Sequence, residues 1–318
     1  MKKILLFGLA IGITFGGFSQ SKVAKSNKEL AKNRTETRAD FNFNKQSNPV
    51  SPNTVNLKTG NAVLLDRAEM GKSGNAYSFL TSYQRCMAYD EASGTILGTF
   101  RADPNTYPGA LSSGTVMSFY STNGSDWDAQ ITINPDGAIH SLRYPSGVIY
   151  NPDNSSNLED LYTVVAGPSH TGGTWDYTYY GVSQMNASNQ SDYYHSWESE
   201  NDWARSSMTV VPDAVYNFGQ DYTSIGDLAT DQTMKQYVGT SDDPADGFEW
   251  EVNTAAPDWL IDASDGHAIA LYTTWSAWSK DGSIGYMWLV GVSNDSYDYG
   301  VYQPQIMYTE DGGDSWDE

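Results

Sequence analysis

From about residue 77 onward, short stretches of alternating apolar and polar residues are separated by turns rich in Gly, Asn, Asp and Pro. A period of two is typical of β-strands that bury one face. The first group of predicted strands covers Tyr83–Tyr89, Thr95–Ala102, Thr115–Tyr120 and Trp127–Ile133. The last group covers Ala268–Trp278, Ile284–Val292 and Gln305–Tyr308. Helical patterns are missing after about residue 40, so the sequence predicts an all-β fold.

Two more divergent groups of strands lie between these. One is predicted at His140–Arg143, Val148–Tyr150, Leu161–Ala166, Thr174–Ser183 and Tyr193–Trp197. The other is predicted at Met208–Tyr216, Tyr237–Thr240 and Phe248–Val252. Units of about four strands cannot bury both faces alone, and we therefore expect them to stack on one another.

The N-terminus has the pattern of an export signal. A basic Met1-Lys2-Lys3 start precedes an apolar run from Ile4 to Phe18, and small residues precede a cut before Gln20. The run is too short to span a bilayer, which needs about 20 helical residues. We expect a signal peptide at 1–19, a disordered or extended linker at 20–75 and a β domain at 76–318. The protein is then secreted or held at the outer cell surface, without a transmembrane segment.

Charge is distributed unevenly along the chain. Residues 1–72 hold 12 Lys and Arg against 5 Asp and Glu, while residues 73–318 hold 6 against 34. So acidic a body repels nucleic acid and anionic membranes. Acidic loops suggest Ca²⁺ as a possible cofactor, at 153–160 or 294–298, although neither loop has a specific calcium spacing. The four histidines show no metal-ligand spacing, and Cys86, the single cysteine, is expected to be a buried apolar residue.

The last ten residues contain a turn motif that occurs a second time, in a weaker form, earlier in the chain. It is formed by Thr309, Asp311, Gly313, Ser315 and Trp316. Asp at the head of such a turn accepts backbone N–H groups, and glycine supplies positive φ. The tryptophan then enters the next strand as an apolar anchor whose indole N–H needs a partner. A weaker copy, with Ser121, Asn123 and Trp127, lies 189 residues upstream.

This motif resembles the Asp-box, or BNR repeat, whose consensus is Ser/Thr-x-Asp-x-Gly-x-Thr/Ser-Trp. The upstream copy departs from the consensus, since Asn123 replaces the Asp and its spacing is one residue shorter. The internal spacing supports a repeat, because Gly94 precedes Trp127 by 33 residues and Gly282 precedes Trp316 by 34. The resemblance implies a turn at the periphery of a blade, away from any active site.

Four-stranded antiparallel units that repeat in this way imply a β-propeller with about four visible blades. Glu318 falls where the fourth strand of the last blade should begin, so we expect an incomplete propeller. Closure by an N-terminal strand, at Asn61–Leu65 or Ala76–Leu80, is the competing interpretation. A β-sandwich with long loops is the alternative architecture.

Asp-box propellers resemble sialidases, some endo-glucanases and many proteins without known activity. Sialidases hold a substrate carboxylate with three arginines, one of them in an Arg-Ile-Pro motif. That motif is missing here, and the arginines after residue 72 are few: Arg85, Arg101, Arg143 and Arg205. No catalytic constellation can be assigned from the sequence, which argues against sialidase action.

One segment combines aromatic and acidic residues in the way that sugar-binding sites do. Its candidate glycan-binding residues are Trp197, Glu198, Glu200, Asp202 and Trp203. Two functions stay open. The favoured one is a secreted propeller that binds a glycan or a protein without catalysis. The alternative is a glycoside hydrolase, sialidase-like or endo-glucanase-like, that uses paired carboxylates.

Overall fold

The structure is a computed structural model. It describes residues 68–78, 84–132, 134, 141–171, 174–185, 190–195, 203–204, 208–220, 222–224, 227–228, 234–264, 268–294 and 302–317. Every described residue belongs to one compact unit, Leu65–Glu318. Strands dominate this unit, with 3-10 turns at Ala76–Ser78 (η1) and Leu158–Asp160 (η2). The all-β prediction is therefore confirmed.

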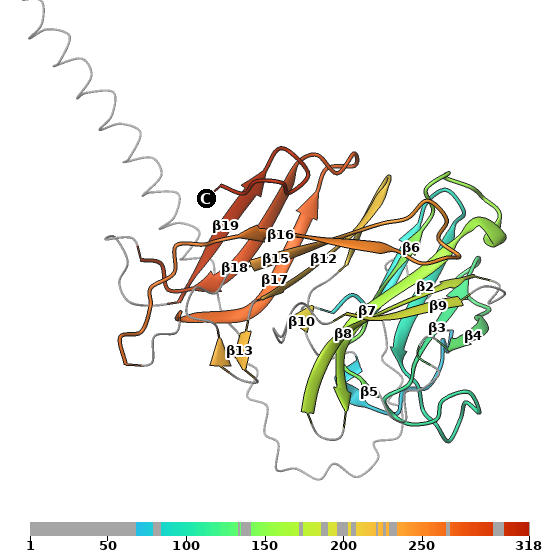
Figure 1. The fold of residues 1–318 in the computed structure, drawn as a ribbon. Coiled ribbons are helices and arrows are strands. Elements are labelled where there is room, and N and C mark those ends of the chain that lie inside the picture. Colours follow the sequence, from blue (N-terminus) through green and yellow to red (C-terminus); the bar gives the residue numbers. More distant parts are fainter. Residues whose placement is uncertain are drawn as a thin grey trace, which may run out of the picture. The chain divides into compact units, whose positions relative to one another are not determined.

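Four main antiparallel sheets follow one another in chain order (Figure 1). Sheet I has the order β1-β2-β3-β4 and contains β1 (Met87–Asp90), β2 (Thr95–Arg101), β3 (Val116–Ser121) and β4 (Asp128–Thr132). In sheet II the order is β5-β7-β8-β9, and β6 also pairs with β7. Its strands are β5 (Ser141–Leu142), β6 (Ser146–Tyr150), β7 (Tyr162–Thr171), β8 (Thr174–Gln184) and β9 (Gln190–His195).

The second half of the unit repeats this arrangement. Sheet III has the order β10-β12-β15-β16, with β11 also paired to β12. Its strands are β10 (Trp203–Ala204), β11 (Thr209–Val211), β12 (Ala214–Gln220), β15 (Met234–Thr240) and β16 (Glu249–Ala255). Sheet IV contains β17 (Ala270–Trp278), β18 (Gly285–Gly291) and β19 (Gln303–Thr309). A small separate hairpin joins β13 (Tyr222–Ser224) to β14 (Asp227–Leu228).

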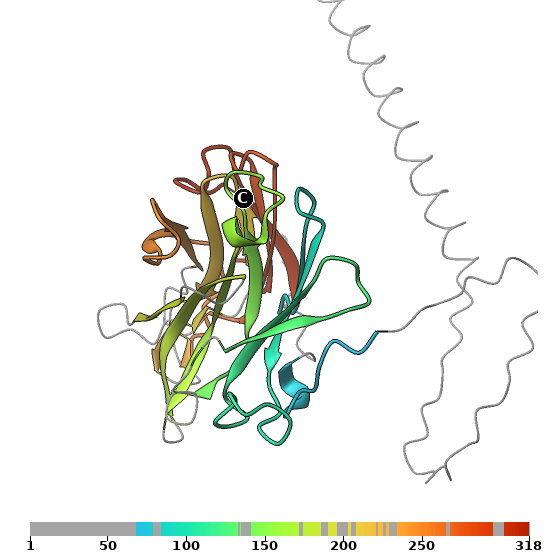
Figure 2. The same cartoon turned by 90° about the vertical axis from the view of Figure 1, so that its right-hand side faces the viewer.

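Successive sheets pack face to face, and sheets II and III are covered on both faces. In β7, Val165 packs toward sheet I while Val164 and Ala166 pack toward sheet III, as the period of two requires. Phe218 of β12 likewise joins a cluster with Met287 of sheet IV. Neighbouring sheets therefore pack on one another through continuous apolar layers. The succession of the sheets can be followed in both views (Figures 1 and 2).

One strand of each sheet lies next to one strand of the following sheet, and we call these four strands, β1, β6, β11 and β17, the first strands. Contacts join β1 to β6, β6 to β11 and β11 to β17. The Gly147 N–H donates to the Arg85 carbonyl at 2.9 Å, and the Arg85 N–H donates to the Ser146 hydroxyl at 3.0 Å. A Cβ added to Gly147 would lie 2.4 Å from the Thr99 hydroxyl oxygen, so glycine permits the close approach of sheets I and II.

Three details differ from the sequence-based expectations. The strand predicted at Met208–Tyr216 is two strands, β11 and β12, because Pro212 and Asp213 form the turn between them. Ala76–Ser78 is a 3-10 turn, so the predicted strand Ala76–Leu80 is wrong in its described part. Residues 68–75 were expected in the linker, yet Met70 packs on sheet I and Ser73 bridges to Ala102. The other proposed closing strand, Asn61–Leu65, lies outside the described residues.

Candidate functional site

The two turn motifs occupy the same place in their sheets. The upstream copy joins the third strand of sheet I to the fourth, β4. The C-terminal copy follows β19, the third strand of sheet IV, and its end returns beside that strand. Backbone hydrogen bonds of 2.7 and 2.9 Å between Tyr308 and Asp317 begin the return. The shared position agrees with the matching internal spacing of the sequence.

Hydrogen bonds within the C-terminal turn match the predicted network. Asp311 accepts from the Ser315 N–H at 3.0 Å, from the Ser315 hydroxyl and from the Thr309 hydroxyl at 2.6 Å. These donors lower the pKa of the Asp311 carboxyl, with the Ser315 hydroxyl as the largest cause. Gly312 and Gly313 have φ values of 79° and 103°, which favour glycine.

The upstream turn is a variant of the same design. The Asn123 side-chain oxygen accepts from the backbone N–H groups of Ser125 and Asp126, both at 2.8 Å. The Ser121 hydroxyl accepts from the Gly124 N–H at 2.8 Å, as the Thr309 hydroxyl does from a glycine in the other copy. Asn therefore replaces Asp without loss of the acceptor, although without its charge.

The tryptophans of both copies are anchors through apolar contact alone. Trp316 lies edge-on to Trp278 at 5.7 Å between ring centroids and to Phe218 at 6.3 Å. Trp127 packs against the cluster on the outer face of sheet I. Among the described residues, neither indole Nε1 donates a hydrogen bond.

Replacing Asp311 with Asn should lower the melting temperature at pH 7, because the charged acceptor of three donors is lost. The folded state lowers the pKa of Asp311, so its contribution is present above the ordinary value near 4 and fades as pH falls below it. Thermal melts at pH 7 and pH 3 should therefore show a smaller difference at pH 3. Asp314→Asn is the control in the same turn, and equal effects of the two variants would contradict the assigned role.

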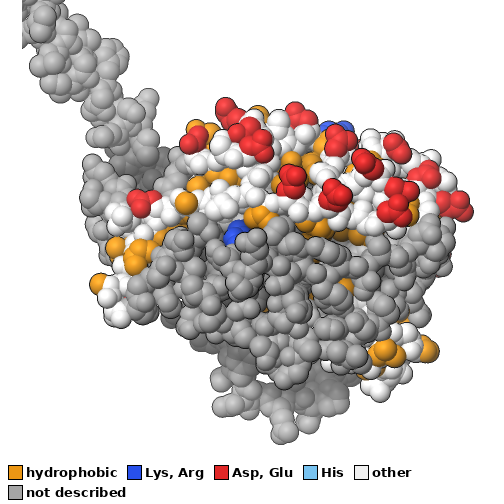
Figure 3. Space-filling view, viewed as in Figure 1, with side chains coloured by type: hydrophobic (Ala, Val, Ile, Leu, Met, Phe, Trp, Pro, Cys, Tyr) orange, Lys and Arg blue, Asp and Glu red, His pale blue; other side chains and the backbone are white. Residues whose placement is uncertain are grey.

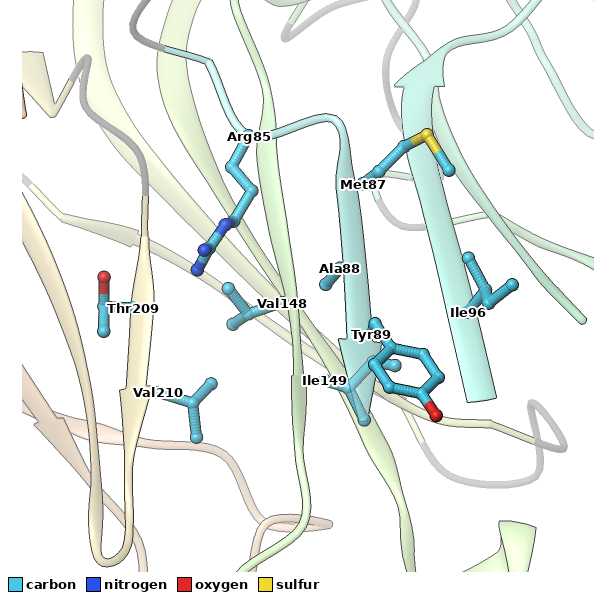
Figure 4. Close-up of a pocket in the computed structure, with 9 residues that line it drawn as sticks. All are labelled: Arg85, Met87, Ala88, Tyr89, Ile96, Val148, Ile149, Thr209 and Val210. Atoms are coloured by element: carbon cyan, nitrogen blue, oxygen red, sulfur yellow. The ribbon is translucent and has the colours of Figure 1, made fainter. Parts of the chain in front are cut away.

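A cavity of about 600 Å³ opens between the first strands of sheets I, II and III (Figure 4). β1 contributes Met87, Ala88 and Tyr89 to the lining, and of these Met87 and Tyr89 are exposed. The described lining contains a single charged residue and no carboxylate: Arg85, Met87, Ala88, Tyr89, Ile96, Val148, Ile149, Thr209 and Val210. The site is thus an apolar groove with one cation and one exposed phenol.

The Arg85 guanidinium is the main polar group of this cavity. It reaches from the segment just before β1 toward the strand of Thr209 (Figure 4), and its Nη1 donates to the Met208 carbonyl at 2.8 Å. Partial removal of water lowers the pKa of Arg85, although the side chain as a whole is exposed. Among the described residues no acidic side chain pairs with it, so four of its five N–H donors are left for a ligand.

Two further arginines lie at the same end of the sheets as Arg85. Arg101 ends β2 and is 2% exposed, and Arg143 comes three residues before β6. By alternation with Leu97 and Thr99, Arg101 faces sheet II. Its Nη2 lies 3.5 Å from the Ser113 hydroxyl, and its Nε has no partner in the described part.

Electrostatics identify Arg101 as an uncompensated buried cation. Burial and, after it, the charge of Arg143 lower the pKa of Arg101 to about 10, against a smaller opposing effect of Tyr144. The nearest acid in sequence, Asp103, binds Asn105 and Thr106 instead. We call Arg85, Arg101 and Arg143 the arginine end. They are the only arginines among the described residues, and none forms an ion pair there.

The opposite end of the sheets is acidic. Turns between first and second strands carry Glu91, Asp213 and Asp281, and the two turn motifs add further acids. One hollow at this end is lined by six acidic residues, Asp153, Asp213, Asp242, Asp243, Asp246 and Glu249. Figure 3 shows Asp and Glu side chains gathered over the upper part of the described surface, with few Lys and Arg. Because one end of the sheets is acidic and the other carries the three arginines, an anion binds most favourably at the arginine end.

The candidate glycan-binding cluster from the sequence falls mostly outside the described residues. Trp197, Glu198, Glu200 and Asp202 lie there, and Trp203 begins β10, where its backbone pairs with Gln220 of β12. Whether the five residues form a site therefore stays a prediction. Sequence reasoning missed the arginine end because its three residues are widely spaced in the chain. A signal did exist, namely the scarcity of arginine in so acidic a body.

The other candidate chemistry has modest support. The Cys86 thiol donates to the Ser78 carbonyl at 2.9 Å, and burial raises its pKa to about 11, so it is a protonated thiol at neutral pH. Within the described ranges no group of three or more His, Cys, Asp or Glu is placed to hold a metal. In the loop 153–160, the Ser155 hydroxyl donates to Asp160 at 2.7 Å. Calcium binding there stays a prediction, and 295–298 lie outside the described part.

No protein-family model matches the chain, and a search of curated proteins finds no match. In the described part of the chain, no helix has the length and apolar character that crossing a membrane requires.

Proposed function

We propose that this protein is a secreted or cell-surface β-propeller that binds acidic glycans at its arginine end. The observation that carries the proposal is the set of three guanidinium groups without ion pairs among the described residues. Uncompensated buried charge costs free energy, and such cost is typical of functional sites. The export signal expected at residues 1–19 places the ligand outside the cell.

The propeller architecture is part of this proposal and has two supports. The first strands lie side by side in chain order, as the inner strands of radiating blades do. Sheets II and III are each covered on both faces, whereas a sandwich gives each sheet a single inner face. The Asp-box resemblance, through Asp311 and Trp316, points the same way. None of the sheets closes on itself in the described part.

The chemistry of the cavity favours an acidic sugar over a neutral one. The planar fork of Arg85 matches a carboxylate or sulfate, and its exposure at the cavity leaves it reachable. Tyr89, 65% exposed, offers an aromatic face on which a sugar ring can stack. The volume of about 600 Å³ suits a small oligosaccharide. Elsewhere the acidic surface repels the same ligand, which confines binding to one end.

Replacing Arg85 with Ala should weaken binding of a carboxylated oligosaccharide, such as an oligogalacturonate, by about tenfold or more. The loss of charge-assisted hydrogen bonds is worth about 1.5–3 kcal/mol. Calorimetric titration of wild type and variant at low salt measures the effect, with a neutral glucan of equal length as the ligand control. Lys280→Ala, which removes a cation at the acidic end, is the matched protein control. Equal affinity of wild type and Arg85→Ala would refute the proposal.

Glycoside hydrolysis receives no support from this cavity. It needs two carboxylates at a defined separation, and the described lining contains none. We therefore propose binding alone. Chromatography of the same titration samples detects any shorter sugars that are released. Their release would show that the function is hydrolysis instead of binding alone.

A further inference from the structure

Sheet IV presents an apolar face that no other sheet of the described residues covers. In β18 burial alternates, so that Met287 and Leu289 are buried while Tyr286 and Trp288 are 53% and 39% exposed. In β19, Ile306 and Tyr308 are 55% and 37% exposed. We call Tyr286, Trp288, Ile306 and Tyr308 the open face.

These side chains form one continuous surface. Tyr286 pairs with Tyr308 and Trp288 pairs with Ile306 across β18 and β19. The Tyr286 and Tyr308 rings lie 6.4 Å apart, and Trp288 lies 4.5 Å from the Trp275 ring of β17. Strands β17, β18 and β19 contain no charged residue. A patch of this kind is unusual on a soluble surface and marks an interaction site.

The open face resembles the apolar faces through which sheets I and II, sheets II and III, and sheets III and IV already pack on one another. Sheet II turns Tyr180 of its third strand toward sheet III, and sheet III turns Phe218 of its second strand toward sheet IV. Tyr286 and Trp288 occupy the second strand of sheet IV and point away from sheet III, since Met287 and Leu289 face it. The face is therefore built to receive another β-sheet.

The other end of the series is closed. The outer face of sheet I, with Phe100 and Phe119, is covered by Met70, Tyr107 and Ala110. The Phe100 and Phe119 rings stack there at 4.8 Å, and the Tyr107 ring lies 5.3 Å from Phe119. A head-to-tail association of copies, sheet IV on sheet I, is thereby hindered over β2 and β3, whereas Met87 and Tyr89 of β1 stay exposed at the edge of that face. The remaining association of identical chains joins the open face to itself, which is a closed two-fold contact.

We infer that two copies of this chain associate through the open face of sheet IV, around a two-fold axis. Charge favours this contact over others, because acidic copies repel one another except where both surfaces are uncharged. Higher salt screens the repulsion that is left and should strengthen the dimer. Binding of an acidic ligand at the arginine end should weaken under the same change, so the two processes separate experimentally.

The test is the molar mass of the purified full chain, measured by sedimentation equilibrium from 1 to 100 µM. Wild type should pass from monomer to dimer and stop there, with a tighter dimer at 0.5 M than at 0.1 M NaCl. Trp288→Lys and Ile306→Lys should stay monomeric at 100 µM, because two copies would then oppose like charges in an apolar contact. Leu111→Lys, at a residue 62% exposed outside the open face, should dimerise as wild type does.

Far-UV circular dichroism and melting curves of the variants check that each has folded. As a second measurement, amide exchange of β18 and β19 in wild type should slow as concentration rises. A wild-type chain that stays monomeric at 100 µM overturns the inference and leaves the open face to a different partner. Growth without limit beyond the dimer, or equal dimerisation of all variants, overturns it as well.

Discussion

Replacement of Phe218 by Ala is expected to lower the free energy of unfolding by about 3–5 kcal/mol, the range for deletion of a buried aromatic side chain. Phe218 is 0% exposed and belongs to the apolar layer between sheets III and IV. Its ring centroid lies 6.3 Å from Trp278 and 6.3 Å from Trp316. The cavity left by alanine would therefore loosen the tryptophan of the C-terminal turn as well.

Urea unfolding followed by tryptophan fluorescence measures this loss. Leu111→Ala is the control, because Leu111 is 62% exposed and its loss should change the free energy of unfolding by less than about 0.5 kcal/mol. A change at Phe218 as small as the control would mean that sheets III and IV do not share the apolar layer.

Replacement of Arg101 by Met is expected to stabilise the protein by about 1–3 kcal/mol, as replacement of a buried charge by an apolar side chain of similar volume often does. Arg101 is 2% exposed, and its Nε has no hydrogen-bond partner among the described residues. The positive charge of Arg143 disfavours the charge of Arg101 further. The same change should weaken binding of acidic glycans, because the positive potential at the arginine end falls. Gain of stability with loss of binding is the signature of a functional charge.

The gain in the free energy of unfolding expected for Arg101→Met depends on pH. Folding lowers the pKa of Arg101 from its usual value to about 10, so the folded state disfavours the charged form. The free-energy cost of the buried charge is fully present below pH 10 and is relieved as pH rises above 10. The stability gain of Arg101→Met should therefore be complete at pH 7 and smaller above pH 10. Urea unfolding at both pH values measures it, with Lys280→Met as control. If Arg101→Met were less stable than wild type at pH 7, the claim that the buried charge of Arg101 costs stability would be wrong.

Local sequence patterns predict much of this fold. The turn from Asp90 to Gly94, with β1 and β2 on either side, follows from alternation and turn residues. The C-terminal turn follows from the chemistry of Asp311 and its neighbouring glycines, and the hydrogen bonds are those expected. Both depend on residues close in the chain, where side-chain preference and backbone geometry act together.

The candidate site depends on distant residues and was not predictable in the same way. Arg85, Arg101 and Arg143 come together because the start of β1, the end of β2 and the approach to β6 lie at one end of neighbouring sheets. That placement requires the strand order and the stacking, which no local pattern specifies. The same holds for the open face, since Trp288 is 39% exposed and no sheet among the described residues packs on that side of sheet IV.

Binding of acidic glycans at the arginine end is tested most directly by NMR of the arginine side chains. In ¹⁵N-labelled protein, the Nε–Hε signals of Arg85, Arg101 and Arg143 can be assigned by single substitutions to lysine. Addition of an acidic disaccharide should shift the Arg85 signal most, with smaller shifts for the other two, while a neutral disaccharide leaves all three in place. Unchanged signals of all three arginines at saturating acidic sugar would contradict the proposed site.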